Sequence, residues 1–308
     1  MTAIPQPGYV LTCGDPAVKT ALHVWLDASR LAWPGTIHLD VDVVDSLPVR
    51  DDPREEFPQP GLLIQAGPPD DNVRIRWTGP EAEAMVHATE PRAVIRLTRE
   101  AAADLEPAER GFLLVALLFV LRRVGWYHIH CAALRDPRGR DWLFVGESRS
   151  GKSTTSAFLA GQGWSVSTDD IGFLIDDGTA VGVRGFCSPI ALRDGGQSLL
   201  GTSGGLDFSR RGKAGFFTED LGGRLVDRVS PQIILFPSVG EATTIEPIAP
   251  RAVINSLIAS SLWVLFESVH AQEHLDLLSR LAAQSMSFRA TLGPDLFANP
   301  SLLLELVP

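Results

Sequence analysis

The chain has 308 residues, of which 45% are hydrophobic and 21% charged, a balance typical of globular proteins with one large domain or two ordinary ones. Its formal net charge is −10, with 27 basic against 37 acidic residues and no basic cluster, so we expect no nucleic-acid partner. Three widely spaced cysteines argue against a disulfide framework and favour a reducing, cytoplasmic environment.

The chain begins MTAIPQPGYVLTCGDP, without a cationic stretch followed by an apolar run, so we expect no signal peptide. The most apolar segment, residues 112–121, is too short to cross a bilayer and is followed by Arg122 and Arg123. We interpret it as a buried helix and expect no membrane partner.

The first 97 residues are typical of short strands and loops. Alternating apolar and polar residues predict strands over 37–44, 72–77 and 93–97, whereas residues 51–69 are rich in proline and acidic residues and predict a surface loop. A helix start is expected at Thr98, and a longer helix over 109–124 ends before Gly125. Residues 1–125 are therefore predicted to form a smaller α+β domain that recognises a substrate or forms an interface.

A second domain is predicted over residues 126–308. Two strands, 127–134 and 141–145, flank a turn at 136–140 and lead into a glycine loop, a helix over 153–161 and a strand over 164–167. This order of strand, loop, helix and strand is the α/β unit that a phosphate-binding loop requires. Further elements are predicted as a strand over 233–237, helices over 251–269 and 271–284, and a strand over 287–292.

The run VGESRSGKST contains the pattern G-x-x-x-x-G-K-S/T of a phosphate-binding loop, also called Walker A. Glycines let backbone N–H groups turn inward around an anion, and the positive end of the following helix points at the same place. Lys152 is expected to reach the β- and γ-phosphates of ATP, and the Ser153 hydroxyl to bind Mg²⁺. The nucleotide-binding residues predicted here are Gly146, Glu147, Ser148, Arg149, Ser150, Gly151, Lys152, Ser153 and Thr154.

Two adjacent carboxylates, Asp169 and Asp170, follow the strand after the loop helix. In many phosphate-loop enzymes a carboxylate at such a strand end holds Mg²⁺, so the predicted metal ligands are Ser153, Asp169 and Asp170. A second carboxylate can accept the proton of an attacking hydroxyl, as a kinase needs. The alternative is a helix cap or a pair of exposed loop acids.

Histidines and cations supply further candidates. His128 and His130 alternate along a strand and face the same way, which suits a catalytic or phosphate-contacting histidine, a structural histidine or, with further ligands, zinc. The cationic stretch SRRGK, with Arg210, Arg211 and Lys213, either closes on phosphates or is a solvated loop. Arg184 and Arg193, which flank GFCSPIAL, are weaker candidates.

As a set, the segments IHCAAL, GESRSGKST, AGQGWSVSTDD, VRGFCSPIAL and RRGKAGFF resemble the HPr kinase/phosphorylase superfamily. The resemblance covers residues 127–237. It implies a nucleotide-binding core like that of HPr kinase and phosphoenolpyruvate carboxykinase, with ATP and Mg²⁺ as cofactors. It also implies that one of Asp169 and Asp170 binds the metal while the other, with His130, handles the proton of an acceptor serine. For a kinase, we expect Arg210, Arg211 or Lys213 to close over the transferred phosphate.

The chain differs from the bifunctional enzymes of that family at Gly182, where they carry an acidic residue, and at Arg149 inside the loop. It is more similar to stand-alone HPr-kinase-related proteins, some of which phosphorylate ribosomally made peptides such as lasso-peptide precursors. The resemblance thus predicts an ATP-dependent serine kinase with a peptide or protein acceptor, and it is compatible with a homo-oligomer. The alternatives are an ATP-binding regulatory module without catalysis and a kinase of a small-molecule hydroxyl.

Overall fold

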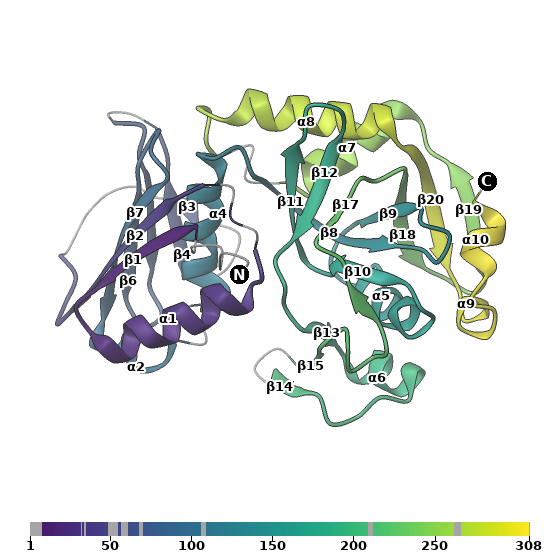
Figure 1. Cartoon of the computed structure of the whole chain (residues 1–308), viewed down its shortest axis with the longest axis horizontal. Coiled ribbons are helices and arrows are strands. Elements are labelled where there is room, and N and C mark those ends of the chain that lie inside the picture. Colours follow the sequence, from purple (N-terminus) through teal and green to yellow (C-terminus); the bar gives the residue numbers. More distant parts are fainter. Residues whose placement is uncertain are drawn as a thin grey trace, which may run out of the picture. The chain divides into compact units, whose positions relative to one another are not determined.

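The computed structural model describes residues 8–31, 33, 35–48, 55–56, 61–67, 70–105, 109–208, 212–261 and 266–307. Over these residues the fold is mixed α/β, with several sheets and helices (Figure 1). The chain divides into two compact units. Unit 1 comprises Met1–Tyr127 and Trp263–His274, and unit 2 comprises His128–Leu262 and Leu275–Pro308.

Unit 1 is built on a seven-stranded sheet in the order β1-β2-β7-β6-β5-β4-β3. The first pairs, β1 with β2 and β2 with β7, are parallel, and the later pairs are antiparallel. The strands are β1 (Tyr9–Cys13), β2 (Ile37–Val44), β3 (Glu55–Glu56), β4 (Leu62–Gln65), β5 (Val73–Trp77), β6 (Ala82–Val86) and β7 (Arg92–Thr98). Helix α4 (Leu114–Arg122) is buried from Val115 to Arg122 and packs on β6 and β7, as its apolar sequence predicts.

Helix α1 (Pro16–Ala28) corrects the prediction that the first 97 residues contain only strands and loops. Its start is specified locally, because the Asp15 carboxylate accepts hydrogen bonds from the backbone N–H groups of Ala17 and Val18, and Pro16 occupies the first turn. Val18, Leu22 and Leu26 form its buried face. The spacing of these three residues is the helical signal that the sequence carried.

Unit 2 is built on a larger sheet whose strands follow the order β17-β12-β11-β8-β9-β18-β20-β19. Two further strands of this sheet lie outside that order: β10 pairs with both β8 and β16. A small separate sheet has the order β13-β15-β14. The strands are β8 (Tyr127–Arg135), β9 (Asp141–Val145), β10 (Ser165–Thr168), β11 (Ile171–Asp176), β12 (Val181–Gly185), β13 (Ile190–Leu192), β14 (Leu206–Phe208), β15 (Lys213–Phe216), β16 (Arg224–Leu225), β17 (Arg228–Val229), β18 (Ile233–Val239), β19 (Thr244–Pro247) and β20 (Met286–Leu292).

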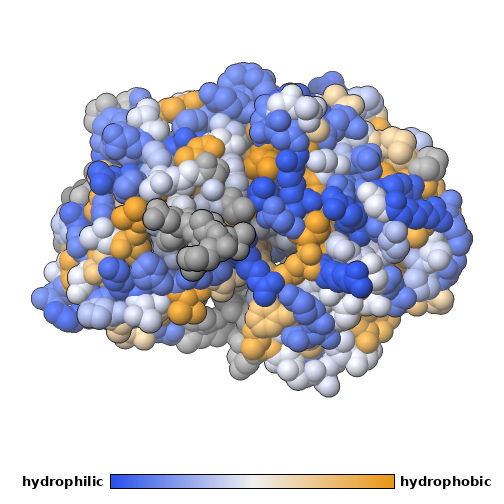
Figure 2. All heavy atoms as spheres, in the orientation of Figure 1, coloured by the Kyte–Doolittle hydropathy of each residue, from blue (hydrophilic) through white to orange (hydrophobic). Residues whose placement is uncertain are grey.

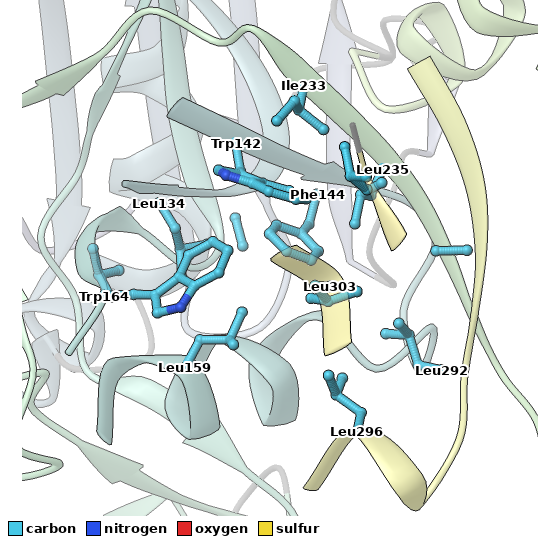
Figure 3. Close-up of a cluster of buried hydrophobic side chains, with 14 of the residues drawn as sticks. Leu134, Trp142, Phe144, Leu159, Trp164, Ile233, Leu235, Leu292, Leu296 and Leu303 are labelled. Carbon is cyan, nitrogen blue, oxygen red and sulfur yellow. The ribbon is translucent and has the colours of Figure 1, made fainter. Parts of the chain in front are cut away.

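The core of unit 2 lies between this sheet and helix α5 (Lys152–Gly161). Figure 3 shows Trp142 and Phe144 of β9 beside Trp164 and Leu159, and the rings of Trp142 and Trp164 have centroids 5.2 Å apart. The Trp142 indole N–H donates to the buried Asp136 carboxylate at 3.0 Å, so its polar edge is also satisfied. Short helices α9 (Asp295–Ala298) and α10 (Leu302–Leu306) add Leu296 and Leu303. This packed layer fixes β9 and α5, the two elements that flank the glycine loop.

Most predicted elements of the second half are confirmed within one or two residues, including β8, β9, α5, β10, β18 and β20. The predicted helix over 251–269 was wrong after Ala259: α7 (Pro250–Ala259) ends there, and residues 260–261 and 266–269 are not helical. Helix α8 (Ala271–Gln284) is confirmed. The predicted loop over 51–69 was wrong at β3 and β4, and much of the rest of it lies outside the described residues.

The predicted division into residues 1–125 and 126–308 stays a prediction, because compactness alone does not test whether either part folds by itself. The predicted division places Trp263–His274 in the second domain, whereas the compact units place this segment in unit 1. Among the described helices, none combines the length and apolar character needed to span a bilayer. On the face drawn in Figure 2, hydrophobic residues lie in small groups among hydrophilic ones.

Candidate active site

Strand β8 organises the candidate site. It pairs antiparallel with β9, with Cys131 opposite Val145, so His130 lies next to the point where β9 ends and the glycine loop begins. On its other side β8 pairs with β10, and the Cys131 N–H donates to the Asp170 carbonyl at 3.3 Å. One strand therefore brings the histidine, the glycine loop and the aspartate pair together.

The glycine loop, residues 146–151, joins β9 to α5. Gly151 has a φ of 96°, a left-handed conformation that glycine adopts without strain, and it begins the helix as its N-cap. Arg149 also has a positive φ of 72°, which is uncommon for a residue with a side chain and often marks functional loops. The first turns of α5 thus point their free N–H groups toward the loop, as an anion site requires.

Lys152 is almost fully buried and holds the loop from within. Its ammonium group donates to the carbonyl of Gly146 at 2.5 Å and to that of Glu147 at 3.0 Å. Burial lowers its pKa, and the nearby charges of Asp169 and Asp170 oppose that effect. The lysine is therefore kept beside the loop by backbone oxygens that phosphate oxygens can replace.

Asp169 follows β10 and is only 6% exposed. Its Oδ1 atom has no hydrogen-bond partner among the described residues. Burial raises its pKa from 3.8 to about 6, although the neighbouring hydroxyls of Ser153 and Ser156 act in the opposite direction. Those two serines lie three residues apart on one face of α5, so the helix presents hydroxyl oxygens to a buried carboxylate.

Asp170 has a different environment. His130 Nδ1 lies 2.9 Å from its Oδ1 atom, and the Asp170 side chain is 54% exposed. It lies in a concave pocket where desolvation would raise its pKa, but the hydrogen bond and charge of His130, with weaker contributions from His128 and Lys213, lower it to about 2. The two adjacent aspartates therefore have opposite pKa shifts, a pattern that divides catalytic roles between paired carboxyl groups in many enzymes.

A pocket of about 450 Å³ contains these groups. One wall of the pocket is formed by Pro189, Ala191, Arg193, Gly195 and Gly196, of which the sequence predicted only Arg193, as a weaker candidate. Gly196 lies against Thr154 of α5, because a Cβ atom added there would come within 3.0 Å of the Thr154 hydroxyl. Gly196 is the sequence feature that permits this close approach, because it has no side chain.

The structure brings most of the predicted site residues to this pocket. Those that line it are His130, Ser148, Arg149, Gly151, Lys152, Ser153, Thr154, Asp169, Asp170 and Lys213. The predicted loop residues Gly146, Glu147 and Ser150 do not line it, although two of them accept hydrogen bonds from Lys152. Arg210 and Arg211 lie outside the described residues. Arg184 is ion-paired with Asp227 at 2.6 Å and does not line the pocket.

The donor groups in the pocket limit the kind of metal site that it can form. Among the described residues, no group of three or more histidine, cysteine or carboxylate side chains is arranged to hold a metal ion. The oxygens of Asp169 and Ser153 fit a different arrangement, in which Mg²⁺ takes one or two protein ligands and completes its shell with water and substrate phosphates. The buried Oδ1 of Asp169, which has no hydrogen-bond partner in the described part of the chain, suits that role.

No family model matches the chain, and no curated protein matches it. Among solved structures, the chain is similar to the HPr(Ser) kinase/phosphatase from Coxiella burnetii, at 13% sequence identity over 58% of this chain and 98% of that chain. The TM-score of that comparison is 0.28. A likeness at this level carries no weight for function, which has to be argued from the pocket.

Proposed function

We propose that the chain is an ATP-dependent kinase that transfers the γ-phosphoryl group of ATP to a serine hydroxyl of a peptide or protein. One observation carries the proposal: the His130–Asp170 pair lines the same pocket as Lys152 and the glycine loop. A module that binds ATP without catalysis needs the loop but has no use for a carboxylate held ionised beside it.

The donor nucleotide is held by the loop. Backbone N–H groups of residues 146–151 and the first turn of α5 surround the phosphates, and Lys152 leaves the carbonyls of Gly146 and Glu147 to bind the β- and γ-oxygens. Asp169 and the Ser153 hydroxyl are the residues that would hold Mg²⁺, which supplies charge neutralisation to the phosphates when bound. The two adjacent aspartates therefore have different roles: Asp169 binds the metal, and Asp170 faces the acceptor.

Asp170 is assigned to the acceptor. Its carboxylate accepts a hydrogen bond from the serine hydroxyl, and His130 fixes its orientation through the contact of 2.9 Å. The serine oxygen forms a bond to the γ-phosphorus while the bond from that phosphorus to the β,γ-bridging oxygen breaks, and the electron pair stays on ADP. The proton of the hydroxyl passes to the Asp170–His130 pair. Positioning and electrostatics account for most of the rate in such reactions.

An acceptor presented by a large molecule suits the exposure of this pair. The side chains of His130 and Asp170 are 37% and 54% exposed, so a serine on a flexible segment can reach them without entering an enclosed cavity. The resemblance of the sequence motifs to stand-alone HPr-kinase-related proteins favours a ribosomally made peptide as that segment.

The test uses γ-labelled ATP, Mg²⁺, the whole chain and a panel of serine-containing peptides, with phosphoserine identified by mass spectrometry. We expect label on serine in the wild type and labelling slower by roughly 10² to 10⁴ with Asp170→Asn. If the protein binds ATP tightly but forms no phosphoester with any peptide, protein extract or small hydroxyl compound, the non-catalytic alternative is correct. If label appears only on small molecules, the peptide acceptor is wrong and the kinase assignment stands.

A further inference from the structure

Two cations meet on the small sheet beside the pocket. In the antiparallel pair of β13 and β15, Leu192 is opposite Ala214, so the next position in register sets Arg193 opposite Lys213. Residues directly opposite each other point to the same face of a sheet. Both Arg193 and Lys213 line the pocket.

The alternation of side chains explains this placement. Ile190, Leu192 and Phe216 are buried in a cluster with Ala157 of α5, which commits one face of the small sheet to the helix. The intervening residue Ala191 lines the pocket. Arg193 keeps an extended backbone, with φ −79° and ψ 165°, and so continues the alternation by one residue beyond the strand.

Neither cation forms an ion pair with a described residue. Over the part of the chain that the structure describes, the side chains of Arg193 and Lys213 make no hydrogen bond or ion pair. This contrasts with Arg135, Arg184 and Arg228 in the same unit, each of which is paired with a carboxylate. Like charges directly opposite each other on a sheet repel, so an anion bound between the two side chains would relieve that repulsion.

The position of Lys213 indicates which anion the two cations bind. Its charge contributes to the lowered pKa values of both Asp170 and Lys152, so it lies near the acceptor-facing carboxylate as well as the lysine of the loop. A group that passes from the nucleotide to the acceptor has to cross this region. The oxygens of the β-phosphate, by contrast, already have binding partners in the loop N–H groups and Lys152.

We propose that Arg193 and Lys213 form a second anion site that holds the γ-phosphoryl group during its transfer. This inference rests on the proposed kinase function, and it adds Arg193 as a catalytic residue that shares one role with Lys213, which the sequence had already predicted. The charge on the three equatorial phosphoryl oxygens is contacted by the guanidinium and ammonium groups while the bond to ADP breaks and the bond to the serine oxygen forms. Both cations stay protonated throughout, and the hydroxyl proton still passes to the Asp170–His130 pair.

The experiment measures binding without turnover. ADP and Mg²⁺ are titrated into the protein with and without aluminium fluoride, which mimics a phosphoryl group in transfer, and the dissociation constants are compared. The variants are Arg193→Gln, Lys213→Gln and the double substitution, and the matched control is Arg251→Gln, an exposed arginine of α7 that does not line the pocket. Melting curves check that each variant is folded.

Aluminium fluoride should tighten ADP binding in the wild type and in Arg251→Gln. Each single substitution should remove about a factor of 10² of that tightening, the range found when one donor to a transition-state charge is lost, while ADP alone binds within about threefold of wild type. Lys213→Arg should restore part of the effect, because the charge is kept. The same variants should lower kcat with little change in the KM for ATP.

The possible failures can be told apart. If the wild type binds neither ADP nor ATP, the proposed function falls, and the inference with it. If ADP binds normally and the double variant keeps the full tightening with aluminium fluoride, the kinase proposal stands and the second anion site is wrong. If aluminium fluoride has no effect on wild-type binding while ADP binds, the two cations hold no phosphoryl group in transfer, and the inference is also overturned.

Discussion

His130 and Asp170 meet through a contact of 2.9 Å between Nδ1 and Oδ1, although 40 residues separate them in the chain. The contact exists because β8 carries the histidine and hydrogen-bonds through Cys131 to the backbone carbonyl of Asp170. It keeps the Asp170 carboxyl ionised, with a pKa of about 2. Asp169, the adjacent residue, is buried and has a pKa of about 6.

Replacing Asp170 with asparagine tests its assignment to the acceptor. We expect phosphoryl transfer to fall by roughly 10² to 10⁴, the usual contribution of a positioned acid or base. ATP affinity should change little, because Asp170 is not part of the loop that binds the donor phosphates. Steady-state rates and nucleotide titrations measure the two quantities, and transfer at the wild-type rate would remove Asp170 from the mechanism.

The pH profile of a His130 variant tests the contact itself. In the wild type Asp170 is a carboxylate at any pH well above 2, so it should cause no loss of kcat between about pH 5 and 8. In His130→Asn the charge is removed while a hydrogen-bonding side chain remains, so desolvation raises the Asp170 pKa. The acid limb of kcat should therefore move to higher pH, and an unshifted limb would show that His130 does not act through Asp170.

Lys152 should contribute strongly to nucleotide affinity. In Lys152→Ala the γ- and β-phosphates lose their cation, and the carbonyls of Gly146 and Glu147 lose their donor. ATP affinity should fall by at least about 100-fold, whereas Lys19→Ala, which alters a lysine of α1 in unit 1, should leave it unchanged. Titration with a fluorescent nucleotide analogue gives both values, and equal affinities for the two variants would contradict the assignment of the loop.

The glycine loop could be predicted from the sequence because its requirements are local: residue type and spacing specify the turn and the helix start. Helix α1 could also have been predicted from Asp15, Pro16 and the spacing of its apolar residues. Arg193 and Lys213 could not have been predicted as a pair, because their proximity depends on the register of two strands about 20 residues apart. The end of α7 at Ala259 was missed because residues 260–269 contain no glycine or proline that would mark a helix end.

Asp169 should be costly for stability and necessary for function. In metal-free protein its carboxyl has a pKa of about 6 when folded and 3.8 otherwise. Below about pH 3 both states are protonated and it costs nothing, but above pH 6 the folded protein must bury a charge, at a cost of roughly 2–3 kcal/mol. Asp169→Asn should therefore unfold at a higher temperature than wild type at pH 8, and the difference should disappear at about pH 3.

The melting temperatures of Asp169→Asn and wild type are compared in chelator-treated protein. Their nucleotide affinities are compared with and without Mg²⁺. We expect Asp169→Asn to lose the Mg²⁺ dependence of nucleotide binding while it gains stability, a trade-off seen where a site keeps a destabilising group for its chemistry. A variant that is less stable than wild type at pH 8 would show that the carboxylate is stabilised by its surroundings, contrary to the pKa shift.

Glu267 should be important for the stability of unit 1. Its carboxylate accepts from Arg122 Nε at 3.0 Å and from Arg123 Nη1 at 2.7 Å, and all three side chains are at most 2% exposed. Glu267→Gln leaves two buried guanidinium groups without a counter-charge, which should lower the free energy of unfolding by about 3–5 kcal/mol. Asp45→Asn is the matched control, because the Asp45–Arg99 pair is 82% and 75% exposed and should leave the denaturation midpoint unchanged. Urea unfolding followed by circular dichroism measures both variants, and equal midpoints would mean that the buried cluster contributes no more than a surface ion pair.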